Sequence, residues 1–106
     1  MEHRRTRRFQ LSLPLAVTRT GAERVALAGF TKNISSCGVL FTSVAQPDLG
    51  GAIEYIIKLN DTGPQPVSLK CIGKVIRSER MVNGHAEENF AYQIAATLER
   101  YEFVKS

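Results

Sequence analysis

The 106-residue sequence has no tryptophan, only two cysteines and two histidines, and no long apolar run. A membrane-spanning helix needs about 20 consecutive apolar residues, which no segment supplies. The N-terminus also lacks the apolar segment and small-residue cleavage site of a secretory signal. We therefore expect a cytoplasmic protein without membrane insertion. The length suits one small domain with a single core and is too short for two.

Motifs for metal binding and catalysis are absent as well. Cys37, Cys71, His3 and His85 show none of the spacings that a zinc site uses, so we expect no metal, no cofactor and two reduced cysteines. There is no Gly-x-Ser-x-Gly element, no glycine-rich phosphate loop followed by Lys and Ser or Thr, and no suitably framed pair of carboxylates. We predict that the protein is not an enzyme.

Positive charge is present but is concentrated at one end of the chain. Fourteen Lys and Arg against ten Asp and Glu give a net charge of +4, of which residues 1–10 carry +3 from four arginines and one glutamate. These arginines are Arg4, Arg5, Arg7 and Arg8. Such a cluster suits a defined anion, such as a nucleotide phosphate or a nucleic-acid backbone. A solvated basic tail is the alternative.

Apolar and polar residues alternate along most of the remaining sequence, which predicts β-strands with one buried face. Six such segments, separated by turn residues, lie at 9–17, 25–34, 39–44, 53–59, 67–78 and 90–98. Six short antiparallel strands with almost no helical periodicity indicate an all-β fold, a small barrel or a sandwich. Within 25–34 the apolar positions change from odd to even numbers, which predicts a bulge at Gly29.

The two ends of the chain are expected to lie outside this β-structure. We predict a flexible arginine-rich arm at 1–8, the β-domain at 9–98, and a short tail or helix at 99–106. Leu98 and Tyr101 have the spacing of a helical turn, but a helix of this length is unstable unless it docks.

A second polar element lies where the second predicted strand ends and the third begins. In Asn33-Ile34-Ser35-Ser36-Cys37-Gly38, Asn33 and Ser35 alternate onto one side of an extended chain. Gly38 lets the backbone approach a ligand or adopt a positive φ. The alternative is a polar turn in which the Asn and Ser side chains bond their own backbone.

Taken together, Arg4-x-x-x-Arg8 before the first strand and Asn33-x-Ser35-x-x-Gly38 after the second resemble the motifs of the PilZ domain, a bacterial receptor domain for the second messenger cyclic di-GMP. The resemblance covers residues 2–98 and implies a six-stranded antiparallel β-barrel. It also implies that Arg4 and Arg8 clamp phosphate and guanine, that Asn33 and Ser35 contact guanine edges or phosphate oxygens, and that Gly38 admits the ligand close to the backbone.

Arg5 and Arg7 lie outside the fixed motif positions. Three roles stay open for them: they add charge, they contact a second ligand molecule, or they are solvated. One or two nucleotides per site are both compatible with the sequence.

We therefore expect a cyclic di-GMP receptor whose arm becomes ordered on binding and thereby signals to a partner protein. One alternative is a PilZ-like adaptor that acts through protein contacts without nucleotide. The other is a nucleic-acid-binding barrel, which usually presents aromatic stacking platforms. The aromatic residues here occupy apolar registers that face the predicted core, which disfavours the nucleic-acid alternative; they are Phe9, Phe41, Tyr55, Phe90 and Tyr92.

Overall fold

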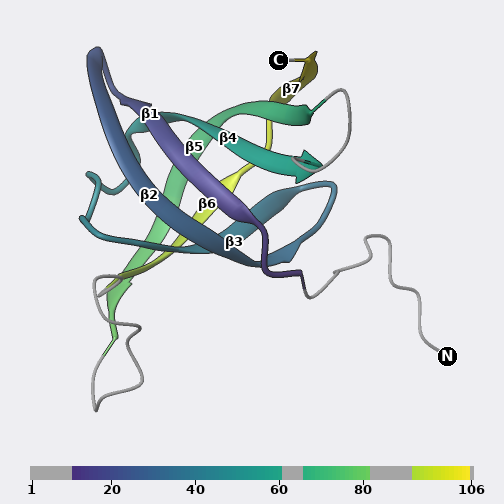
Figure 1. The fold of residues 1–106 in the computed structure, drawn as a ribbon. Coiled ribbons are helices and arrows are strands. Elements are labelled where there is room, and N and C mark those ends of the chain that lie inside the picture. The colour runs from purple at the N-terminus through teal and green to yellow at the C-terminus, as the bar shows by residue number, and fades with distance from the viewer. Residues whose placement is uncertain (1–10, 61–65, 82–91, 106) are drawn as a thin grey trace, which may run out of the picture.

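A computed structural model describes residues 11–60, 66–81 and 92–105 (Figure 1). These residues form seven strands, and none of them belongs to a helix that could cross a membrane. The strands are β1 (Pro14–Thr20), β2 (Glu23–Ile34), β3 (Gly38–Ser43), β4 (Ala52–Asn60), β5 (Val67–Arg80), β6 (Tyr92–Thr97) and β7 (Arg100–Lys105).

Six of the strands close into an antiparallel barrel. Neighbouring strands pair in the order β4-β1-β2-β3-β6-β5, and β4 also pairs with β5, which completes the ring. The prediction of an all-β, six-stranded antiparallel barrel is therefore confirmed. The long strand β5 makes closure possible because its first part, Val67–Lys74, pairs with β4, whereas its second part, Val75–Arg80, pairs with β6.

The first strand is shorter at its N-terminal end than the alternation predicts. It begins at Pro14, and Leu11–Leu13 precede it without regular strand structure. Phe9, Phe90 and the whole arginine-rich arm lie outside the described residues.

The C-terminal residues form a strand, not the helical turn that the spacing of Leu98 and Tyr101 favours. β7 pairs with the first part of β5, from Val67 opposite Lys105 to Ile72 opposite Arg100. Pairing along a strand that is already formed satisfies the backbone groups of a segment too short to be a stable helix.

The core fills the barrel interior with alternate residues from the barrel strands, as expected for a half-buried sheet, and β2 contributes buried Thr31 and the partly buried Val25 and Leu27. Its fully buried members are Leu15, Val17, Val39, Phe41, Ile53, Tyr55, Ile57, Cys71, Val75, Ile94 and Ala96. The rings of Phe41 and Tyr55 stack with centroids 5.7 Å apart. Two of the five aromatic residues expected in the core are thus fully buried there, while Tyr92 is half-buried.

Burial also determines the chemistry of two titratable core groups. The Tyr55 hydroxyl donates a hydrogen bond to the Thr97 carbonyl at 3.0 Å. Desolvation, with smaller contributions from Cys71 and Glu99, raises the pKa of Tyr55. Desolvation raises the pKa of the Cys71 thiol to about 12, so this thiol is neutral and unreactive near pH 7.

The predicted bulge at Gly29 is wrong in position. Gly29 pairs in register with Leu15. The bulge after which the apolar positions change parity lies at Lys32, the extra residue between the pairs Thr31–Phe41 and Asn33–Leu40, and β2 is also irregular opposite β1 between Arg24 and Leu27. Gly29 is required for a different reason. A Cβ atom there would lie 1.9 Å from the carbonyl oxygen of Thr42, so only glycine lets the two chain segments approach this closely.

Candidate functional site

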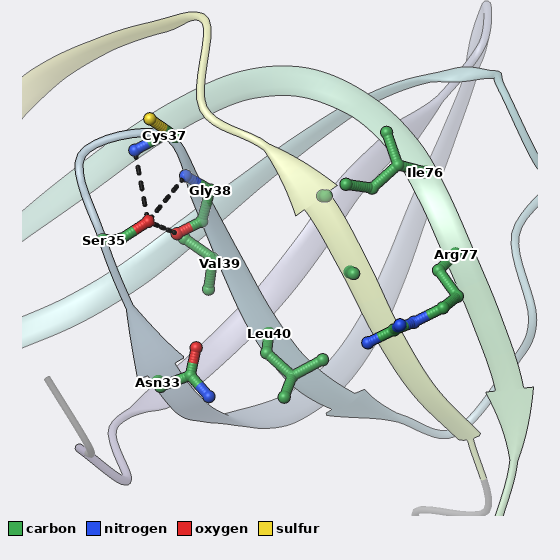
Figure 2. Close-up of a pocket in the computed structure, with 10 residues that line it drawn as sticks. Asn33, Ser35, Cys37, Gly38, Val39, Leu40, Ile76 and Arg77 are labelled. Atoms are coloured by element: carbon green, nitrogen blue, oxygen red, sulfur yellow. Dashed lines mark hydrogen bonds between the residues drawn. The ribbon is translucent and has the colours of Figure 1, made fainter. Parts of the chain in front are cut away.

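The turn between β2 and β3 is held by the side chain of Ser35. Its hydroxyl accepts hydrogen bonds from the backbone N–H groups of Cys37 and Gly38, both at 3.2 Å, and lies 3.2 Å from the Gly38 carbonyl oxygen (Figure 2). The Ser35 backbone N–H donates to the same carbonyl at 2.9 Å. The polar-turn alternative is therefore correct for Ser35, whose side chain bonds its own backbone, but not for Asn33, whose side chain bonds no described residue.

Gly38 belongs to the packing of the barrel wall. A Cβ atom at this position would lie 2.7 Å from the carbonyl oxygen of Ala96 on β6, which is too close for any residue with a side chain. Its backbone does not use a positive φ, because the described glycines with positive φ are Gly21 and Gly50. Glycine is needed at position 38 so that β3 and β6 can pair at the start of β3.

Asn33 faces outward because of the bulge at Lys32. Buried Thr31 faces the core, and strict alternation would place Asn33 on the same inner side. The extra residue Lys32 reverses the parity, so that Asn33 pairs with half-buried Leu40 on the outer face. The Asn33 carboxamide makes no hydrogen bond with any described residue, which leaves its donors and acceptor available to a ligand.

A second bulge brings Arg77 to the same face. Ile76 is the extra residue between the pairs Val75–Ala96 and Arg77–Ala95, so Arg77 points outward although it lies two positions after buried Val75. Asn33 pairs with Leu40, Leu40 with Ala95, and Ala95 with Arg77, so these residues form one row across β2, β3, β6 and β5. In Figure 2 the Arg77 side chain reaches over β6 toward Leu40.

This row lies in two adjoining open hollows on the outer face, which share Asn33 and Leu40. The first is lined by Asn33, Ser35, Cys37, Gly38, Val39, Leu40, Ile76, Arg77, Ala95 and Ala96. The second is lined by Leu11, Ser12, Thr31, Lys32, Asn33, Leu40 and Gln93. Among these residues Lys32 and Arg77 are cations and none is an acid. The surface is therefore electropositive and suits an anionic ligand.

The second hollow also marks where the arginine-rich arm joins the barrel. Buried Thr31 donates its hydroxyl hydrogen to the Leu11 carbonyl and accepts from the Leu13 N–H at 2.8 Å. These bonds hold Leu11 and Leu13, which follow the arm in the sequence, beside β2. Their partner, Thr31, lies two residues before Asn33. In the sequence, Arg8 is three residues and Arg4 seven residues before Leu11.

The architecture and this surface define a class: a small closed β-barrel with a polar, electropositive outer face next to a basic N-terminal segment. Comparison with known families gives the class its name. The family model of the PilZ domain matches residues 2–102, which is nearly the whole chain, and the protein therefore belongs to the PilZ domain family. No curated protein and no solved structure matches the chain. PilZ domains are binding domains, in general for cyclic di-GMP, and are not a catalytic family.

The structure brings together only part of the site that the sequence predicts. Asn33, Ser35 and Gly38 all line the first hollow. Arg4, Arg5, Arg7 and Arg8 lie outside the described residues, and their contacts stay predictions. The residues that sequence reasoning missed are Arg77 and Lys32. Alternation alone would have pointed Arg77 inward, since Cys71 and Val75 in the same strand are core residues. Only the pairing register reveals the bulge that reverses it.

The hydrogen bonds of Ser35 predict an asymmetry between two neighbouring serines. Ser35→Ala removes an acceptor used by two N–H groups, and because each such bond contributes about 0.5–1.5 kcal/mol, we expect the free energy of unfolding to fall by roughly 1–2 kcal/mol. Ser36→Ala is the matched control, since among the described residues the Ser36 hydroxyl contacts only the Cys37 sulfur, at 4.0 Å. Urea denaturation measures both. Equal stability of the two variants would contradict this role of Ser35.

Proposed function

We propose that this protein is a cyclic di-GMP receptor and that the nucleotide binds on the outer face around Asn33, clamped by Arg4 and Arg8 of the arm. The observation that carries the proposal is the attachment of the arm. The first described residue after the arm, Leu11, is bonded to Thr31 at the edge of an acid-free surface on which the Asn33 carboxamide has no described partner. Membership of the PilZ family supports the identity of the ligand.

The chemistry of the ligand matches the residues assembled here. Cyclic di-GMP carries two phosphodiester charges and two guanines, and each guanine presents O6 and N7 as adjacent acceptors. A guanidinium group has a planar fork of donors that fits either a phosphate or this guanine edge with two parallel hydrogen bonds. The carboxamide of Asn33 can both donate and accept at a base edge.

Ser35 and Gly38 contribute in a different way from Asn33. Because the Ser35 hydroxyl is engaged by its own turn, its main contribution is to hold the backbone of residues 35–38 in shape beside the ligand. Gly38 keeps the start of β3 close to β6 in the wall that carries the first hollow. Arg77 adds a guanidinium group from the opposite side of the hollow. Arg5 and Arg7 increase the local charge or contact a second nucleotide.

The domain acts by binding, without catalysis. Nucleotide binding orders the arm against β2 and changes the surface offered to a partner protein in the cytoplasm. The nucleotide-independent adaptor is the alternative, and a calorimetric titration with cyclic di-GMP that shows no heat of binding would favour it. Phe41 and Tyr55 are fully buried, and the exposed aromatic residues Phe30, Tyr101 and Phe103 line neither electropositive hollow, which argues against an aromatic platform for single-stranded nucleic acid at this surface.

Calorimetric titration with cyclic di-GMP tests the clamp. Arg4→Ala and Arg8→Ala each remove charge-assisted hydrogen bonds, which contribute about 1.5–3 kcal/mol. Because about 1.4 kcal/mol corresponds to a factor of ten in the dissociation constant, each substitution should weaken binding at least about tenfold. Arg24→Ala is the matched control. This exposed arginine lies near the start of β2, about 30 Å along the strand from Asn33 at 3.3 Å per residue. Undiminished affinity of the Arg4 and Arg8 variants would refute the clamp.

Arg77→Ala should weaken nucleotide binding by about tenfold on the same reasoning. Arg77→Lys should restore only part of the loss, because an ammonium group keeps the charge but lacks the planar fork. The control is Arg80→Ala, an exposed arginine in the same strand that lines neither hollow. If the Arg77 and Arg80 variants bind equally well, Arg77 takes no part in the site.

Ordering of the arm predicts protection from trypsin, which cleaves after arginine. Saturating cyclic di-GMP should slow cleavage after Arg4, Arg5, Arg7 and Arg8, because a bound segment cannot enter the protease active site in extended form. Mass spectrometry of timed digests gives the rate at each site, and GMP at the same concentration is the control ligand. Cleavage at an unchanged rate would contradict the proposed response of the arm.

A further inference from the structure

Strand β7 has one edge without a partner strand in the described part of the chain. It pairs with β5 along one edge, and no other described strand contacts it. Each of the six barrel strands, in contrast, has a partner on both sides. In Figure 1 β7 lies at the end of the barrel, next to the C-terminus. An open strand edge presents unpaired N–H and C=O groups that form a template for another strand.

The face of β7 that continues the barrel interior is aromatic and uncovered. Tyr101 lies opposite Cys71, and Phe103 lies opposite Leu69, so both side chains continue the inner layer of the sheet. Cys71 is completely buried, whereas Tyr101 is 62% and Phe103 67% exposed. Since an aromatic side chain can bury about 150–250 Å², this pair leaves roughly 200–300 Å² of aromatic surface open to solvent.

Charged residues flank this aromatic pair at alternate positions of the chain. Lys105 follows Phe103 in the alternation and lies opposite Val67. Glu99 precedes Tyr101, and its backbone N–H donates to the Ile72 carbonyl at 2.9 Å, which continues the contact with β5. Glu99 lies just before β7, and its carboxylate accepts a hydrogen bond from the Thr97 hydroxyl at 2.9 Å and contributes to the raised pKa of Tyr55. At every second position from 99 to 105 the chain is thus acidic, aromatic, aromatic and basic.

Such an order is complementary to itself when the strand runs antiparallel to a second copy. If Glu102 lies opposite Glu102 of the second copy, Glu99 lies opposite Lys105 of that copy and Tyr101 opposite its Phe103, and each pair occurs twice. Opposite charges and aromatic pairs directly across antiparallel strands each contribute about 0.2–1 kcal/mol.

The same register is compatible with the charged residues on the outer face of β7. The two Glu102 carboxylates that meet at its centre are like charges, which alone would be unfavourable. However, Lys70 lies directly opposite Glu102 on β5, and Arg100 occupies the diagonal position on the second copy. Each carboxylate therefore lies near Lys70 of its own chain, which also pairs with Glu54 at 3.9 Å, and near Arg100 of the other chain.

We propose that two copies of this protein form a symmetric dimer by antiparallel pairing of their β7 strands. The two barrels then share one continuous sheet, and the four aromatic side chains cover one another on one face. Two-fold symmetry follows because the same residues of each copy contribute to both halves of the interface. The short contact, of about six residues per chain, lies at the small end of specific interfaces, so the dimer should be in exchange with monomer. The proposal does not depend on nucleotide binding.

Sedimentation equilibrium over a range of protein concentrations tests the dimer. The mass should rise from 11.7 kDa toward twice that value. Phe103→Ser should weaken association at least about tenfold, because it removes an aromatic group from the centre of the contact. Leu49→Ser is the matched control, since Leu49 is 68% exposed in the connection between β3 and β4 and should leave association unchanged. Circular dichroism checks that the variants are folded.

Charge exchange tests the register. Glu99→Lys or Lys105→Glu alone places like charges opposite each other and should weaken the dimer, whereas the double variant restores opposite charges and should recover it. A chain that stays monomeric up to its solubility limit overturns the proposal. So does a dimer that Phe103→Ser leaves intact, or a double variant no better than the single ones. Calorimetry of Phe103→Ser with cyclic di-GMP separates the two proposals, because nucleotide binding should persist in that variant.

Discussion

Closure of six strands into a narrow barrel requires each strand to bend strongly, and the extra residues Lys32 in β2 and Ile76 in β5 accommodate this bending. A bulge has a second consequence, because it reverses which side chains face the core. After Lys32 the chain presents Asn33 outward, and after Ile76 it presents Arg77 outward. The bulges that help to close the barrel therefore also create its polar outer surface.

Different residues of the PilZ motif have different physical roles. Ser35 and Gly38 stabilise the fold. Ser35 does so through hydrogen bonds inside its turn, and Gly38 lets β3 pack closely against Ala96. Asn33 has no described partner and is the residue of this element that a ligand can engage directly. A polar turn and a ligand site, which appear as alternatives in the sequence, are therefore compatible, since the turn positions the site.

The two ends of the chain depend on the barrel in similar ways. The bonds between Thr31, Leu11 and Leu13 fix the start of the barrel beside Asn33, so that a basic segment with no strand pattern begins near the proposed ligand surface. At the other end, β5 extends past β6 and offers its edge to β7. The strand that closes the barrel thus also creates the exposed edge with Tyr101 and Phe103.

The sequence alone determined the all-β class, because period-two alternation in six segments is typical of a small antiparallel barrel or sandwich, whereas closure into a barrel follows from the pairing of β4 with β5. It also determined the concentration of arginine at the N-terminus and the polar turn at 33–38, since both are local patterns. Only the tertiary structure decided the position of the bulges, the outward direction of Arg77 and the conversion of the C-terminal residues into β7. Those features depend on which strands pair and in which register, and pairing between residues distant in the sequence leaves no trace in the alternation of a single strand.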